Sequence, residues 1–254
     1  MGEAELALNE ALASRQQLAA AHPERLDLVA YVGSSDMSMG DLAYHRGDLA
    51  TTLAWYDRAI AMLNENLRSE PRHMLSRLFL KNAASVRAEC LSRLKRHGEA
   101  MSAWEHAIEL HEATERDEPR LGRAISQARA GDYERALAEA DVLARTQAIP
   151  PGQRSYKLAC LFACAAAAIQ NDTSLAAAAR AAWAETMAAR AVERLGEAIR
   201  AGYFDDLEKV LTFQKDADLE TLRARRDCQT FLMDLAFPAD PFPPIPSPES
   251  GSEL

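Results

Sequence analysis

Small and apolar residues recur along the chain at helical spacing, and the whole pattern returns 48 residues later. In the first clear copy these positions are Thr52, Tyr56, Ala59 and Ile60, and in the next they are Ala100, Trp104, Ala107 and Ile108. Residues four, seven and eight positions apart lie on one face of an α-helix. The pattern therefore predicts amphipathic helices that belong to a repeated structural unit.

Prolines mark the same period. Pro23, Pro71 and Pro119 are 48 residues apart, and Glu70-Pro71-Arg72 returns as Glu118-Pro119-Arg120. Self-similarity at a fixed period of this size is typical of a repeat array, in which no unit buries its apolar face alone. The spacing thus favours a helical solenoid over a single globule.

Residues 131–137, Gly-Asp-Tyr-Glu-Arg-Ala-Leu, resemble the turn and second-helix start of a tetratricopeptide (TPR) repeat. Related turns lie at Gly47 and Leu94, and a divergent copy spans 191–198. Small residues stand where the paired helices of such repeats cross, at Gly40, Ala88, Ala124 and Cys160. The resemblance implies an all-α fold, a right-handed α-solenoid of antiparallel helix pairs.

The spacing of 48 residues exceeds the TPR length of about 34. We assign the surplus to longer second helices and linkers at 61–68 and 109–117. Residues 23–203 then hold about four TPR-like helix pairs. Residues 1–22 match a second helix without a first helix, and form either a cap or the end of a longer array.

The last repeat and the C-terminal part are less regular. Residues 171–182 interrupt the fourth pair and predict either a short extra helix or a helical extension. Gly202 is placed to end the last repeat helix. Residues 204–236 predict capping helices, a short one near 205–212 and a final one over 218–235.

Residues 237–254 contain six prolines within 14 positions, which disfavours helix and sheet. We expect a disordered tail. Its Pro-x-x-Pro at Pro241 to Pro244 could also dock into an aromatic groove.

Charge and composition narrow the function. The formal net charge of −9 disfavours binding to a nucleic-acid backbone, which needs clustered cations. No apolar run reaches the roughly 18 residues that span a bilayer, so we expect no membrane association. The acidic start lacks the features of a signal peptide. We therefore expect a soluble, reduced, cytoplasmic protein.

A second resemblance covers the C-terminal half. It is similar to the TPR region that follows the catalytic domain in a group of bacterial serine/threonine protein kinases. The similarity lies in five segments that follow in the same order, at 156–160, 188–192, 199–203, 216–223 and 233–242. The chain departs from that group at Ala217, where proline is usual, and at Cys228, where phenylalanine is usual. The Gly-rich loop, the His-Arg-Asp loop and Asp-Phe-Gly are all missing, so the chain is not itself such a kinase.

Other candidate chemistry has a structural interpretation. Cys160 and Cys164 lie one turn apart and could form half of a metal site or a redox pair, but two small residues on a buried face fit better. His106 and His111 do not share a helix face and do not form the HExxH motif. We expect no catalytic residue, no cofactor and no metal.

The first helices of a TPR array line its concave groove. Counting from the turns, the exposed groove positions are Asp41, Tyr44, His45, Asn82, Ser85, Glu89, Arg93 and Arg129. TPR modules that hold a terminal carboxylate use lysine and asparagine in their first repeats, where this chain has Met37 and Asp41. Because Asp41 would repel a carboxylate, we expect a different ligand.

The sequence thus predicts a non-enzymatic scaffold or adaptor that binds a protein or peptide in its concave groove. The alternative is a regulatory C-terminal region related to a kinase but without its catalytic domain. An enzyme with an unfamiliar groove site is disfavoured because no cluster of titratable groups marks one. Self-association through residues 1–22 also stays open.

Overall fold

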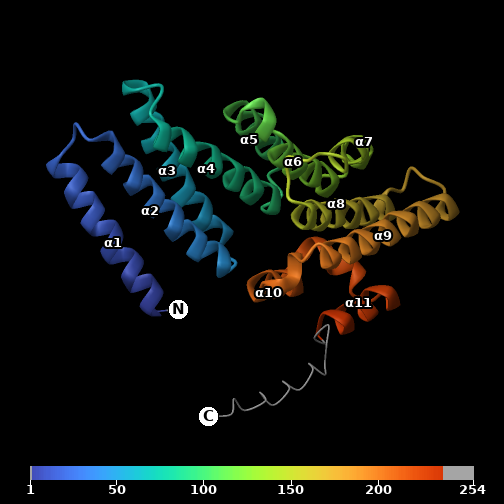
Figure 1. The fold of residues 1–254 in the computed structure, drawn as a ribbon. Helices are drawn as coiled ribbons and strands as arrows, with labels where there is room; N and C mark the ends of the chain where they lie inside the picture. The colour runs from blue at the N-terminus through green and yellow to red at the C-terminus, as the bar shows by residue number, and fades with distance from the viewer. Residues whose placement is uncertain (1, 237–254) are drawn as a thin grey trace, which may run out of the picture.

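The computed structural model describes residues 2–236, and helices are the only regular secondary structure within them (Figure 1). The first helix, α1 (Gly2–Ala21), precedes eight helices that follow in consecutive pairs. These are α2 (Leu26–His45) with α3 (Leu49–Ser69), α4 (Met74–Arg93) with α5 (His97–Leu110), α6 (Asp117–Arg129) with α7 (Tyr133–Leu143), and α8 (Pro151–Asn171) with α9 (Ala177–Arg200). The all-α prediction is confirmed, and the pairing is consistent with a helical solenoid.

The remaining elements are short. A 3-10 turn, η1 (Ala113–Glu115), joins α5 to α6. After α9 come η2 (Tyr203–Asp205), α10 (Leu207–Lys215), η3 (Ala217–Leu222) and α11 (Arg226–Ala236). The predicted Pro-rich tail at 237–254 lies outside the described residues. No helix in the described part of the chain is long and apolar enough to cross a membrane.

The helices succeed one another from α1 at one end to α9, with α10 and α11 beside α9 (Figure 1). First helices of successive pairs also touch, α2 with α4, α4 with α6, and α6 with α8. A continuous face built from first helices results, and it carries the candidate site.

The repeated aromatic positions wedge helices together. A Cβ atom on Gly40 would lie 2.7 Å from the Tyr56 ring, and one on Gly122 would lie 2.3 Å from the Trp104 indole. Only glycine allows a ring so close to the backbone of the next helix. Tyr56 and Trp104 are 1% and 4% exposed, so these positions of the repeated helical face are buried.

Left-handed turns separate the two helices in each of the first three pairs. Gly47 and Gly131 have φ values of 78° and 91°, which glycine adopts without steric cost. Lys95 takes the same place between α4 and α5 with φ 60°, although its Cβ makes that conformation less favourable. The turns predicted from the repeat are therefore present.

Three other predictions have clear outcomes. α3 continues to Ser69, so residues 61–68 do extend a second helix, whereas 109–117 form mostly a linker. α9 begins at Ala177, so the interruption in the fourth pair is in part a helical extension. Gly202 ends α9 with φ 71°.

The prediction of one final helix over 218–235 is wrong. The Asp216 side chain accepts a hydrogen bond from the backbone N of Asp218 at 3.1 Å and starts η3 instead. Leu219 and Leu222 are buried three residues apart, which matches the period of a 3-10 helix. α11 begins only at Arg226.

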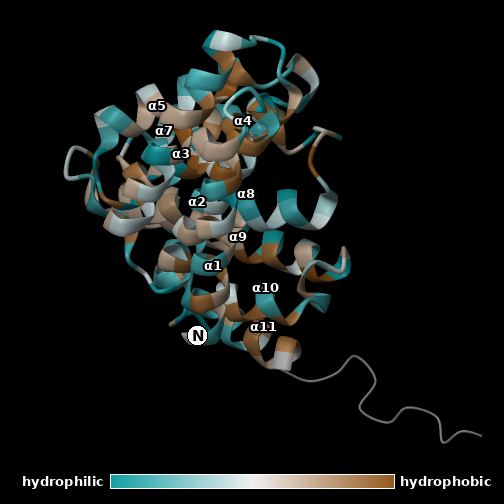
Figure 2. Cartoon of the chain, turned by 90° about the vertical axis from the view of Figure 1, so that its left-hand side faces the viewer, coloured by the Kyte–Doolittle hydropathy of each residue, from teal (hydrophilic) through white to brown (hydrophobic). Residues whose placement is uncertain are grey.

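The C-terminal elements share the core of the last two pairs. The largest cluster of buried side chains runs from α6 to α11. The rings of Phe204, Phe213 and Phe231 meet edge to face at 5.3 to 5.8 Å between centroids. Figure 2 shows hydrophobic ribbon, in brown, along α9, α10 and α11. In α1, by contrast, Leu12 alone is buried among the described residues of the helix.

Candidate functional site

Six of the eight predicted groove residues line one cavity of 380 Å³. They come from the C-terminal halves of three successive first helices: Asp41 and Tyr44 from α2, Ser85, Glu89 and Arg93 from α4, and Arg129 from α6. Helix α8 and the start of η3 supply the facing wall with Tyr156, Lys157, Cys160, Asp216 and Asp218. The repeat brings the predicted residues together because each occupies the same part of its helix.

The other two predicted residues lie outside this cavity. His45 is exposed, with its ring 6.3 Å from that of its neighbour Tyr44. Asn82 is exposed nearly two turns before Glu89 on α4. Neither side chain lines the cavity.

Arg129 is the centre of an ion-pair cluster. Its guanidinium donates to both carboxylate oxygens of Asp218, at 2.8 and 2.6 Å. It also donates to both oxygens of Glu89, at 2.9 and 2.8 Å, and to the Ser92 hydroxyl at 3.0 Å. Two bidentate pairs fix the guanidinium on both sides.

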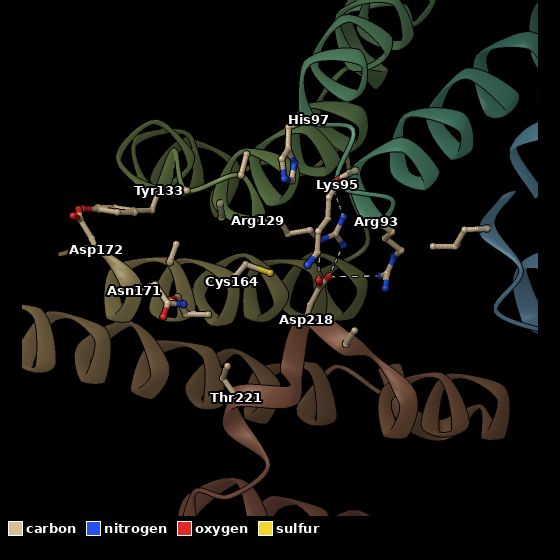
Figure 3. Close-up of a pocket in the computed structure, with 18 residues that line it drawn as sticks. Arg93, Lys95, His97, Arg129, Tyr133, Cys164, Asn171, Asp172, Asp218 and Thr221 are labelled. Atoms are coloured by element: carbon tan, nitrogen blue, oxygen red, sulfur yellow. Dashed lines mark hydrogen bonds and ion pairs between the residues drawn. The ribbon is translucent and has the colours of Figure 1, made fainter. Parts of the chain in front are cut away.

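Arg93 joins the same carboxylates. Its Nε donates to Glu89 at 2.6 Å, and its Nη2 lies 3.5 Å from Asp216. The same Nη2 lies 3.6 Å from Asp218 (Figure 3). The Tyr156 hydroxyl donates to Asp216 at 2.7 Å. Three carboxylates thus share two guanidiniums, and the cluster ties η3 to α4, α6 and α8.

Solvation differs from the prediction. The groove residues were expected to be exposed, but the side chain of Arg129 is 12% exposed and those of Glu89 and Arg93 are each 22% exposed. The expectation is wrong for these three residues because they pair with one another and with Asp218 of η3. Tyr44 and Ser85 are half-buried as well. Removal of water strengthens each ion pair and raises the cost of leaving any member unpaired.

The surrounding charges and burial set the protonation states of Glu89, Arg129 and Tyr44. Burial raises the pKa of Glu89, but Arg129 and Arg93 outweigh burial and lower that pKa to about 2. Burial lowers the pKa of Arg129, yet the charges of Glu89 and Asp218 hold it well above its ordinary value. Burial raises the pKa of Tyr44 to about 12, so its hydroxyl keeps its proton near neutral pH.

Asp41 stands apart from the cluster. Its carboxylate is exposed and accepts the Tyr56 hydroxyl at 2.5 Å. Within residues 2–236 the Tyr56 hydroxyl is its one side-chain partner. At the cavity rim Glu118 is neutralised by Lys157, whose Nζ lies 2.9 Å away. Asp41 is therefore a cavity carboxylate without a cation.

Cys160, Asp216 and Asp218 approach the geometry of a metal site, with one ligand atom each within 4.8 Å of the others. The two carboxylates are already paired with Arg93 and Arg129. Burial and the neighbouring Asp216 raise the pKa of the Cys160 thiol well above its ordinary value, so the thiol keeps its proton beside these carboxylates. The chemistry of these donors fits the arginine cluster better than a cation, and the small-residue interpretation of Cys160 agrees with its burial.

A second hollow of 1040 Å³ shares Arg93, Arg129 and Asp218 with the first cavity. Figure 3 shows it with Lys95 and His97 near the cluster and with Tyr133 and Asp172 further away. The cluster forms a common wall between the two spaces.

Sequence reasoning missed the facing wall. Asp216 and Asp218 entered only as part of the kinase-like series. Two aspartates before a Leu-x-x-Leu pair do indicate a capped helical turn. Nothing local indicates that Asp216 reaches Arg93, which is 123 residues earlier in the chain.

No protein-family model matches this chain, and no curated protein matches it. The TPR and kinase-region resemblances therefore rest on the residues quoted for them.

Proposed function

We propose that this protein is a non-enzymatic scaffold that binds a protein or peptide in the groove of a right-handed array of antiparallel, TPR-type helix pairs. The observation that carries the proposal is that six predicted groove residues from α2, α4 and α6 line one cavity. A concave surface of this kind is what helical repeat arrays offer to extended ligands.

The ionisable groups of the site support binding over catalysis. A general acid or base works best with a pKa near the working pH. The pKa of Glu89 is lowered to about 2 and that of Tyr44 is raised to about 12. These groups hold their protonation states near neutrality and serve to position η3 and shape the cavity.

The alternative function, a regulatory region related to a kinase, rests on the C-terminal series. In this structure Leu219 and Leu222 of that series are buried in the core. Packing accounts for these positions, so the similarity supports a shared architecture. We therefore propose a cytoplasmic adaptor. The four buried free cysteines are compatible with a reducing compartment.

The test is a selection of random 12-residue peptides on the immobilised full chain, followed by calorimetry. Two matched variants locate the binding: Ser85→Trp fills the groove, whereas Ser102→Trp adds the same side chain to an exposed site on α5. We expect micromolar peptides whose binding Ser85→Trp abolishes and Ser102→Trp leaves intact. No selected peptide, or equal binding by both variants, contradicts the proposal.

A further inference from the structure

We propose that the groove ligand is a basic peptide that places an arginine or lysine side chain in the 380 Å³ cavity, beside Asp41. This inference rests on the proposed function and specifies the chemistry of its partner.

The side chains that line the cavity carry more negative than positive charge. The cavity is lined by five carboxylates, Asp41, Glu89, Glu118, Asp216 and Asp218, and by three cations, Arg93, Arg129 and Lys157. Two negative charges are left over. That surplus makes the cavity more favourable for a cationic ligand than for an anionic one.

The cations that line the cavity are already paired with carboxylates. Arg129 is engaged on both sides by bidentate carboxylates, and Lys157 is paired with Glu118 at 2.9 Å. An acidic peptide would have to break one of these pairs and leave a cavity carboxylate without its partner. A cationic side chain breaks none of them, because Asp41 holds only the neutral Tyr56 hydroxyl.

The cavity lining also includes apolar side chains. Val86 and Ile125 line the same cavity, together with the aromatic residues Tyr44, Trp104 and Tyr156. Arginine and lysine bury their methylene stems against apolar groups while the charged end stays near polar partners. Aromatic rings add attraction for a cation that lies over their faces. A short anion would be repelled by the surplus carboxylates. A purely aliphatic side chain would contact the apolar residues but leave Asp41 without a cation.

Three fluorescein-labelled peptides test the inference: Gly-Ala-Arg-Ala-Gly-Ala-Arg-Ala-Gly and its versions with glutamine or glutamate in place of arginine. Binding to the full chain is measured by fluorescence anisotropy at two salt concentrations. We expect the arginine peptide to bind about tenfold more tightly than the glutamine peptide, and the glutamate peptide to bind least.

Two variants that each remove one negative charge provide the decisive comparison. Asp41→Asn preserves the acceptor for Tyr56, and Glu10→Gln changes an exposed residue of α1. We expect Asp41→Asn to weaken the arginine peptide by about fivefold, and Glu10→Gln to leave it unchanged. Equal losses in both variants would assign the binding to the overall charge of −9 and overturn the inference.

The peptide selection separates the two proposals. Groove-binding peptides without a required arginine or lysine would overturn the basic ligand while the scaffold function stands. The absence of any groove-binding peptide would overturn both.

Discussion

At the scale of single residues, the Arg129 guanidinium is the best example of burial that changes the role of a side chain. Without Asp218 and Glu89 it would be a groove cation with no paired carboxylate, but with them it joins three elements, α4, α6 and η3. The energetic consequence is asymmetric: the intact cluster adds modest stability, whereas a broken one leaves charges in a poorly solvated place.

Arg129→Met should therefore lower the free energy of unfolding by about 3 kcal/mol, since Glu89 and Asp218 lose their shared partner. Urea unfolding followed by circular dichroism measures the change. The control is Arg96→Met, whose pair with Glu99 is exposed on both sides and should matter by less than about 0.5 kcal/mol. Similar losses in both variants would contradict the structural role of Arg129.

The lowered pKa of Glu89 predicts that the free energy of unfolding depends on pH. Its pKa is about 2 in the folded protein against 4.5 for the free side chain, so the unfolded chain takes up the proton first as pH falls. The contribution of Glu89 is complete above about pH 4.5 and is lost between there and about pH 2, on the order of 3 kcal/mol in all.

Unfolding in urea at pH 5, 4 and 3 measures this loss. The variant Glu89→Gln should be less stable at pH 5 but should lose stability less steeply below that pH. Parallel pH profiles for the two proteins would show that Glu89 does not titrate as described.

At the scale of elements, close approach between helices depends on glycines placed under aromatic rings. Gly122→Ala would place a Cβ 2.3 Å from the Trp104 indole, which is fixed by a 2.8 Å hydrogen bond to Ser126. We expect a loss of about 2 kcal/mol from overpacking. Thermal unfolding measures the loss of stability.

Gly98→Ala in α5 is the matched control, because a Cβ there meets nothing within 4 Å. Alanine favours helix more than glycine, so this variant should gain up to about 1 kcal/mol. A loss in the control comparable to that of Gly122→Ala would remove the steric explanation.

At the scale of the whole molecule, the two ends of the array differ in how much apolar surface they bury against the neighbouring helices. The C-terminal elements share a core with α6 to α9 through Phe204, Phe213 and Phe231. α1 contributes Leu12 to a small cluster with Val32 and Met39. The buried apolar area, and hence the stabilisation, is larger at the C-terminal end.

A chain that ends at residue 202 should therefore lose protection from hydrogen exchange throughout α8, whereas a chain that starts at residue 23 should retain it. Exchange measured by mass spectrometry compares the two truncations directly. Retained protection of α8 in the first truncation would mean that α10, η3 and α11 are dispensable, and would also weaken the case for η3 as a wall of the groove.

The sequence by itself determined the helical class, the repeat and most of the turn positions. These depend on local periodicity and on glycine at left-handed turns, as at Gly47 and Gly131. The repeat also placed Glu89, Arg93 and Arg129 correctly on one face, because equivalent positions of stacked units point the same way.

Only the tertiary structure decided what covers that face. Asp216 and Asp218 reach it from the segment where sequence reasoning placed the start of the final helix, and Asp216 is 123 residues after Arg93. Such contacts depend on how the last elements pack back on α8, and no local pattern encodes the path of the chain. Periodicity reports which residues share a face, whereas burial and pairing depend on the whole fold.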